Sequence, residues 1–228
     1  MAQGAKKALH EALRAMFDYS DKAVLSVEEK EQLLDEMEDQ LSTFLLELSA
    51  VSLTDEDSRT VTELLHTISD FERISDHAMN MIEITQEMEQ NSRSFSDSAK
   101  NDFSTLFAAL TEITELTVKA FENNDTELAM NVEPLEEVID DLTAEIRDKH
   151  IDRLRKGECS PELGVYLSDL LINCERVSDH CSNIAVSIIQ IAKSSMRSHV
   201  YLNELKAQRS EQFIGAYNSY HEKYRLYA

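Results

Sequence analysis

Hydrophobic residues recur three or four positions apart through almost the whole chain. Apolar residues at positions i, i+3, i+4 and i+7 are typical of an amphipathic α-helix, which buries one face and exposes the other. The pattern predicts helices over residues 5–25, 28–49, 56–91, 97–123, 125–156, 161–196 and 198–225. Capping and turn residues predict the breaks at Ser26 and within 52–57, 91–96, 123–125 and 156–161. With only four Gly and two Pro, the chain lacks the turn formers of a sheet protein, so the predicted fold class is all-α.

The chain contains an internal repeat. A shift of 103 residues places ERISDHAMN (72–80) over ERVSDHCSN (175–183), with six of nine positions identical. A shift of 101 residues aligns LLDEMEDQL (33–41) with PLEEVIDDL (134–142). These matches predict two tandem pseudo-repeated three-helix bundles with up-down-up topology. We expect the first over 1–95, the second over 96–196, and an extra C-terminal helix over 197–228 that packs on both.

Charge and cysteine content narrow the classes of partner and location. The chain has 22 Lys and Arg against 44 Asp and Glu, a net charge of −22, which repels nucleic acid and favours cations. Cys174 and Cys181 lie seven residues apart, roughly 10 Å along one helix, too far to form a disulfide. This predicts a reducing, cytoplasmic setting. No run of apolar residues is long enough to cross a membrane, although the chain can equally be the soluble part of a longer membrane protein.

Pairs of acidic residues four positions apart are the candidate metal ligands. About eight such pairs are expected by chance in so acidic a chain, but four of them hold one common position beside an apolar row. They are Asp35 with Asp39, Glu72 with Asp76, Glu136 with Asp140, and Glu175 with Asp179. Like charges at this spacing destabilise a helix by about 0.2–0.5 kcal/mol per pair, which a bound metal ion would relieve. Oxygen-only ligands suit Ca²⁺, Mg²⁺, Mn²⁺ or iron and argue against an ordinary structural zinc site.

The arginines and histidines near these pairs are expected to have structural roles. Arg73 and Arg176 directly follow a glutamate and are expected to pair with carboxylates on the same or a neighbouring helix. His77 and His180 lie about 100° round the helix from the acidic edge. We therefore expect the two histidines to pack against or cap neighbouring helices and not to bind metal directly.

The repeated ERISDHAMN and ERVSDHCSN motifs, together with the acidic pairs of the preceding helices, resemble the PhoU family over residues 5–196. The resemblance implies multinuclear iron or zinc clusters, or other oxygen-liganded divalent cations, on the two bundles. It assigns the metal ligands Glu72, Asp76, Glu175, Asp179, Glu136, Asp140, Asp35 and Asp39. In the first unit Glu38 departs from the pattern, because the second unit has the apolar Ile139 there.

The resemblance also implies a function and a set of partners. A PhoU-like protein restrains phosphate uptake and phosphate-responsive signalling, as a cytoplasmic regulator at the inner face of the membrane. Its implied partners are a membrane phosphate transporter, in cis or in trans, a sensor kinase and a second copy of the chain in a homodimer, and they do not include nucleic acid.

The C-terminal helix departs from free-standing PhoU proteins. Residues 196–228 carry five Lys and Arg against three Asp and Glu, a charge of +2. This tail, with its YLNEL segment, is similar to the end of the cytoplasmic PhoU-like region of sodium/phosphate cotransporters. Its tyrosines recur every three or four residues and predict a stripe that packs on the bundles. They are Tyr217, Tyr220, Tyr224 and Tyr227.

The predicted function is therefore regulatory and not enzymatic, since the sequence shows no nucleophile with its base. Two alternatives stay open. A ferritin-like di-metal carboxylate enzyme would need Glu-x-x-His motifs on facing helices, and the chain has one, Glu63 with His66. A metal-free helical scaffold would make the acidic edges merely solvated surface.

Overall fold

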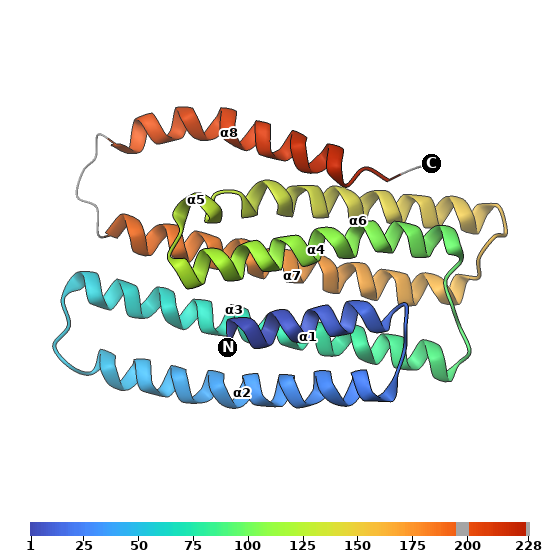
Figure 1. Ribbon diagram of the computed structural model, residues 1–228, viewed down its shortest axis with the longest axis horizontal. Coiled ribbons are helices and arrows are strands. Elements are labelled where there is room, and N and C mark those ends of the chain that lie inside the picture. Colours follow the sequence, from blue (N-terminus) through green and yellow to red (C-terminus); the bar gives the residue numbers. More distant parts are fainter. Residues whose placement is uncertain (195–200, 227–228) are drawn as a thin grey trace.

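The computed structural model describes residues 1–194 and 201–226, with side chains described over 1–192 and 211–226. These residues form helices and no strand, which confirms the all-α prediction (Figure 1). The helices are α1 (Ala2–Ala15), α2 (Asp21–Ser49), α3 (Asp55–Gln90), α4 (Asp97–Asn123), α5 (Thr126–Ala129), α6 (Val132–Arg155), α7 (Pro161–Ser194) and α8 (Tyr201–Lys223).

The long helices run side by side along one axis of the molecule (Figure 1). Helices α1, α2 and α3 pack on one another, as do α4, α6 and α7, so each expected unit contains three long helices in contact. Helices α3 and α7 form the main contact between the two groups. Helix α8 lies on the outside of α6 (Figure 1). No helix in the part of the chain that the structure describes is both long and apolar enough to cross a membrane.

The first predicted break is wrong by several residues. The pattern predicted a helix to residue 25 and a break at Ser26, but α1 ends at Ala15 and α2 begins at Asp21. Ser20 has an extended backbone, and its side chain accepts a hydrogen bond from the Ala23 amide at 3.2 Å, which caps α2. Ser26 lies inside α2, where its hydroxyl accepts from the Lys30 ammonium group. The cap at Ser20 therefore starts the helix at Asp21 and not at residue 28, about two turns earlier than predicted.

The predicted helix over 125–156 is split in two. Asp125 accepts hydrogen bonds from the amides of Glu127 and Leu128, both at 3.0 Å, and starts the short α5. Helix α6 then begins at Val132 and carries Pro134 in its first turn, where a missing amide hydrogen costs no helical hydrogen bond. The break predicted within 52–57 is present, because Thr54 and Asp57 form a capping box at the start of α3. The predicted boundary between the last two helices, at residue 197, lies outside the described residues.

Apolar rows from both units meet in one continuous core. On α3 the row Phe71, Ile74 and Ala78 is buried, and on α7 so is the row Cys174, Val177 and Cys181. All three cysteines are free. The rows point inward on both helices, so the acidic residues beside them are turned toward the outer edges of the bundles. These residues are Glu72, Asp76, Glu175 and Asp179.

The two histidines of the repeated motifs connect the units, as expected. His180 Nδ1 lies 2.8 Å from Asp70 Oδ1, and His77 Nδ1 lies 2.9 Å from Asn173 Oδ1. The two imidazole rings stack with their centroids 5.5 Å apart. Asp70 and Asn173 are themselves equivalent under the shift of 103 residues, so the two hydrogen bonds are related by the internal repeat.

The tyrosines of α8 contact the bundle. Tyr224 is buried, and Tyr217 and Tyr220 are half-buried against the core. The hydroxyl of Tyr224 donates to Glu112 of α4, which also pairs with Lys223 at 2.6 Å. Tyr227, the last member of the predicted stripe, lies outside the described residues.

Candidate metal centre

The acidic edge of the second unit brings together the carboxylates that the sequence predicted there. Asp140 of α6 and Glu175 and Asp179 of α7 line one surface hollow. Glu136, one turn before Asp140, lines a neighbouring hollow that also includes Asp179. All four predicted residues of this unit therefore lie along the groove between α6 and α7.

Partial burial and mutual repulsion raise the pKa of carboxyl groups along this edge. Burial, followed by the negative charge of Asp140, raises the pKa of Glu136 to about 7. Burial, followed by the charges of Asp179 and Glu175, raises the pKa of Asp140 to about 6. A carboxyl with a raised pKa binds its proton more tightly because its negative form is desolvated and repelled by like charges. The edge therefore attracts positive charge.

The acidic edge of the first unit contains residues of α2 and α3 that do not all correspond to those of the second unit. Burial, followed by a hydrogen bond to Asp76 and its charge, raises the pKa of Glu72 to about 7, and Glu38 of α2 contributes further repulsion. Burial and the charges of Asp76 and Asp35 raise the pKa of Glu31, which also lies on α2. Glu72 and Asp76 thus face α2 as predicted, and Asp35 lies beside this edge.

Two residues of this edge were missed by the sequence pattern. Glu31 and Glu38 are half-buried on α2, seven residues apart on the side that faces α3. Asp39, which the sequence predicted as a ligand, is one residue past Glu38, about 100° further round the helix, and is exposed. The substitution of glutamate for the apolar Ile139 of the second unit was the available signal, because it places a carboxylate where an apolar side chain packs.

Basic and hydroxyl side chains hold several of these carboxylates. Arg176 pairs with Asp179 at 3.1 Å, and Arg73 pairs with Asp76 at 3.3 Å. Glu175 accepts hydrogen bonds from Thr143 at 2.7 Å and from Arg147 at 3.1 Å, both on α6. The arginine side chains are largely exposed, so each of these pairs contributes little to stability.

Among the described side chains, those of residues 1–192 and 211–226, no group of three or more His, Cys, Asp or Glu is already arranged to hold a metal ion. The groove between α6 and α7 nevertheless fits an oxygen-liganded cation in the type of donor it offers, because carboxylates from two helices line a shared hollow. Exposed side chains such as Arg176 occupy these donors at present and would have to release them.

The single Glu-x-x-His motif does not form part of such a site. Glu63 accepts a hydrogen bond from Ser187 of α7 at 2.8 Å, and His66 is exposed. The two side chains therefore do not converge on one point inside the bundle, as a ferritin-like centre requires.

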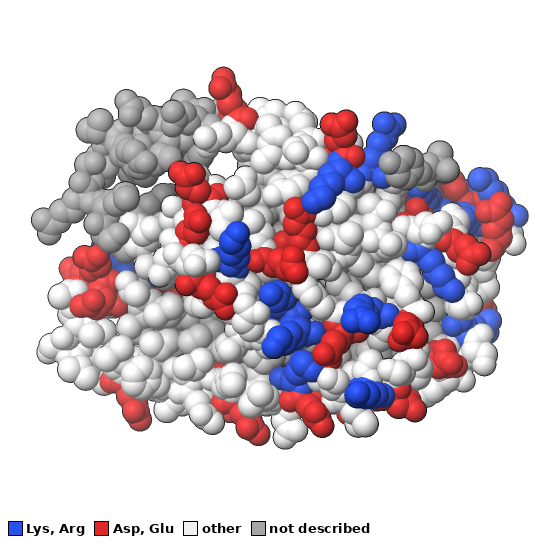
Figure 2. All heavy atoms as spheres, viewed as in Figure 1, with Lys and Arg blue, Asp and Glu red and all other residues white. Residues whose placement is uncertain are grey.

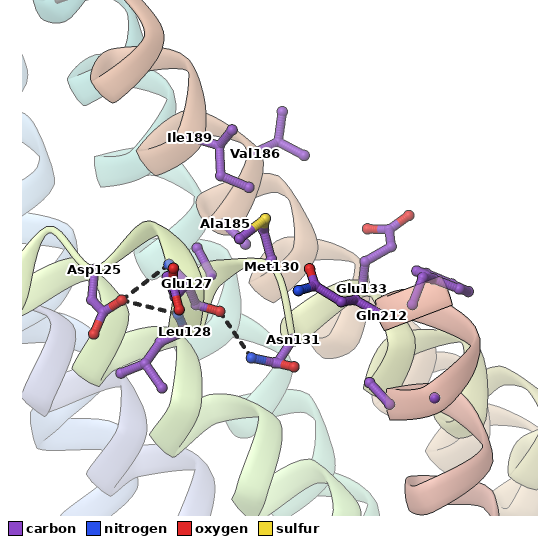
Figure 3. A pocket seen from close by; sticks show the side chains of 14 residues that line it. Asp125, Glu127, Leu128, Met130, Asn131, Glu133, Ala185, Val186, Ile189 and Gln212 are labelled. Carbon is purple, nitrogen blue, oxygen red and sulfur yellow. Dashed lines mark hydrogen bonds between the residues drawn. The ribbon is translucent and has the colours of Figure 1, made fainter. Parts of the chain in front are cut away.

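A separate apolar cavity of about 770 Å³ lies between α5, α7 and α8 (Figure 3). Met130, Ala185 and Ile189 are among its apolar lining residues. Of its acidic residues, Asp125 caps α5 and Glu133 accepts a hydrogen bond from Ser182. Its lining is predominantly apolar, so this cavity differs in chemistry from the acidic edges.

Comparison with known proteins identifies the family. The family model of the PhoU domain matches the sequence over residues 1–85 and 103–188. The phosphate-specific transport system accessory protein PhoU homolog 1 of Thermotoga maritima is 23% identical over 186 residues, which cover 81% of this chain and 79% of that protein.

Two solved structures share the fold. The crystal structure of PhoU from Pseudomonas aeruginosa has a TM-score of 0.79 and 18% identity, over 85% of this chain and 92% of that one. The phosphate transport system regulatory protein PhoU from Streptococcus pneumoniae has a TM-score of 0.74 and 16% identity, over 86% and 92% respectively. Because the family model matches most of the sequence, in two segments that fall within the two repeated units, this chain belongs to the PhoU domain family.

Proposed function

We propose that this chain is a non-enzymatic, metal-binding regulator of phosphate uptake and phosphate homeostasis that acts on a membrane phosphate transporter. The names of its relatives support the regulatory part, since one is a transport-system accessory protein and another a transport-system regulatory protein. The observation that carries the metal-binding part is the groove between α6 and α7, where Asp140 faces Glu175 and Asp179.

Each predicted ligand has a definite place in this proposal. A cluster of iron, zinc or another divalent cation would be held by Glu136, Asp140, Glu175 and Asp179 in the second unit. In the first unit Glu72 and Asp76 would hold it, with Asp35 and the exposed Asp39 of α2 as the further predicted ligands. The cations supply positive charge that neutralises carboxylates which otherwise repel one another. Exposed arginines give up their carboxylates at low cost, because surface ion pairs contribute about 0–1 kcal/mol.

The proposed location is the cytoplasmic side of the membrane, as the regulatory part of a sodium/phosphate cotransporter. The family match ends at residue 188, and α8 lies beyond it. Free-standing PhoU proteins lack a helix after the matched region. The presence of α8, in a basic segment that follows an acidic body, therefore favours the PhoU-like region of a cotransporter. A sensor kinase and a second copy of the chain remain further proposed partners.

Metal analysis tests the proposed centre. Protein purified without added metal is expected to carry iron or zinc in stoichiometric amounts. Inductively coupled plasma mass spectrometry measures this metal content. Glu175→Gln with Asp179→Asn should remove most of the metal, because both substitutions keep side-chain size but delete the charge. The matched control, Asp148→Asn with Asp152→Asn on α6, should keep it.

Two results would overturn the metal-binding proposal. Wild-type protein without bound metal, even after incubation with Fe²⁺, Zn²⁺ or Mn²⁺, would favour a metal-free scaffold. Repeated turnover of Fe²⁺ under oxygen would favour a ferritin-like enzyme. The regulatory part is tested separately, because cells that lack the chain should take up phosphate without restraint when phosphate is plentiful.

A further inference from the structure

An apolar row along α2 is buried at one end of the helix and exposed at the other. The row repeats every seven residues, at Val27, Leu34, Leu41 and Leu48. Val27 and Leu34 are 0% and 2% exposed, whereas Leu41 and Leu48 are 40% and 38% exposed. Since residues seven apart lie on nearly the same side of a helix, all four point in about the same direction. The neighbouring structure, and not the direction of the side chains, therefore causes the difference.

Helix α1 accounts for the change. It covers the first part of the row, and its Gly4 packs so closely on Leu34 that an added Cβ would lie 3.2 Å from a methyl group of that leucine. Gly4 lies in the first turn of α1, so within the described residues α1 covers Leu34 but not Leu41 or Leu48, which lie about two and four turns further along α2. Figure 1 shows the far halves of α2 and α3 extending well beyond the start of α1.

The exposed part of the row belongs to a wider apolar surface, which we call the α2 stripe. It consists of Leu33, Leu41, Phe44 and Leu48 of α2 and of Val51 just after the end of the helix, all exposed. Separations of eight, three and four residues keep the first four on one side of α2. Figure 2 shows a broad uncharged surface at this end of the molecule. A contiguous exposed apolar surface of this kind is typical of an interaction site.

In the second unit, a helix covers the position that is equivalent to the exposed Leu41. Under the shift of 101 residues Leu41 corresponds to Leu142 of α6, which is only 5% exposed. There α4 continues past this position, since its Asp102 pairs with Lys149 and Arg153 near the end of α6. Near its start α4 also buries Phe103. In the second unit, therefore, the equivalent place is occupied by an amphipathic helix.

The charge around the α2 stripe indicates which kind of partner helix could cover it. Residues 31–58 contain nine Asp and Glu and no Lys or Arg. Of these, Glu36 and Glu47 are exposed along the same side of the stripe. A second copy of this surface, or an anionic lipid surface, would bring like charges together. A helix with Lys and Arg beside its apolar face would bring opposite charges together.

We propose that the α2 stripe binds an amphipathic helix of the regulated transporter, with an apolar face flanked by Lys and Arg, placed end to end with α1. This inference rests on the proposed function, because it names the surface through which the chain contacts its transporter. The helix buries Leu41 as α4 buries the equivalent Leu142 of the second unit, and it extends over Leu48 one further pair of turns along α2.

Site-specific photo-crosslinking in the cells that make the protein tests this contact. The probe is benzoylphenylalanine at position 44 or 48, and the matched control carries it at position 46. Leu46 is 59% exposed, like Phe44, but lies on the opposite side of α2. Positions 44 and 48 should crosslink a phosphate transporter, through a peptide that has apolar residues at helical spacing with Lys or Arg beside them. Position 46 should yield about ten times less of this product, because its probe points away from the interface.

Several results would overturn the inference. They are a crosslink only to a second copy of the chain, a crosslink to lipid, a crosslink to a protein segment without the apolar and basic pattern, and equal yields at positions 44 and 46. In the expected case, Leu41→Asp with Leu48→Asp should lower the yield at position 44 about a hundredfold, since it places two charges in an apolar interface. Leu46→Asp is the control for added charge.

Phosphate uptake separates failure of this inference from failure of the proposed function. If cells lacking the chain take up phosphate normally, the proposed function is wrong. If those cells are deregulated but Leu41→Asp with Leu48→Asp restores full regulation, the function stands and the α2 stripe is not the contact. Both leucines are exposed, so this variant should fold, and an unchanged melting temperature verifies it.

Discussion

Asp102 shows how a single buried charge can fix the contact between two helices. It is only 5% exposed on α4 and accepts hydrogen bonds from Arg153 at 2.8 Å and from Lys149 at 3.2 Å, both on α6. Arg153 is itself 8% exposed. Charges this deeply buried are tolerated only as partners, because each alone would have lost its hydration without compensation.

Removing Asp102 should therefore destabilise the fold strongly. Asp102→Ala leaves Arg153 buried without its anionic partner, which we expect to lower the free energy of unfolding by about 3 kcal/mol. Urea denaturation followed by circular dichroism measures this change. The control is Asp152→Ala, which breaks the exposed Asp152–Arg155 pair and should cost less than about 1 kcal/mol. Equal effects from the two variants would contradict the role given to burial.

At the scale of the element, the sequence predicted which side of each helix carries the acidic pairs, but not every acidic residue that lies near them. The spacing of Glu136 and Asp140 fixes their common side of α6, because the helix has a constant rotation per residue. Spacing alone could not reveal Glu31 and Glu38, since their inclusion depends on how close α3 lies to α2. Asp39 shares the spacing of the pattern and is exposed, one residue past Glu38.

The pH dependence of the metal-free protein tests the edge between α6 and α7. The pKa of Glu136 is about 7 and that of Asp140 about 6 in the folded state, above their ordinary values of 4.5 and 3.8. A raised folded-state pKa stabilises the fold at low pH, and this contribution is lost as the pH rises through 6–7. Between pH 5 and pH 8, the melting temperature of the wild type should therefore fall more than that of Glu136→Gln with Asp140→Asn.

Scanning calorimetry in the presence of a chelator provides this comparison. The control variant, Asp148→Asn with Asp152→Asn, should keep the slope of the wild type. Parallel curves for the wild type and the Glu136→Gln, Asp140→Asn variant would mean that these carboxylates do not repel one another in the folded protein. A divalent cation added at pH 8 should raise the melting temperature of the wild type and of the control variant more than that of the Glu136→Gln, Asp140→Asn variant, because it replaces the lost protons.

At the scale of the whole molecule, α8 is attached to a body that is already complete. Its described contacts are with α6 and, through Tyr224 and Lys223, with Glu112 of α4. The core of the two units comes from the other long helices. Local loss of α8 should therefore leave the body folded.

Truncating Tyr224 should release α8 without unfolding the bundles. Tyr224 is 6% exposed, and Tyr224→Ala removes both its buried ring and its hydrogen bond to Glu112. Hydrogen exchange should show amide protection lost over 211–223 and retained over α3 and α7. Ile214→Ala, at a residue 57% exposed on the same helix, should leave protection unchanged. Loss of protection throughout the chain would show that α8 is part of the cooperative unit.

The sequence by itself determined the all-α fold, the internal repeat and the side of each helix that carries the acidic pairs. These properties are local, because apolar periodicity and helical rotation act within a dozen residues. The same local signals misplaced the first break at Ser26, since they did not show that Ser20 caps α2.

Tertiary structure decided what depends on distance between helices. It placed Glu38 beside Glu72, joined the units through His77 and His180, and left Leu41 and Leu48 uncovered beyond the start of α1. None of this follows from spacing along one helix, because burial and electrostatic repulsion depend on which side chains a neighbouring helix brings into contact.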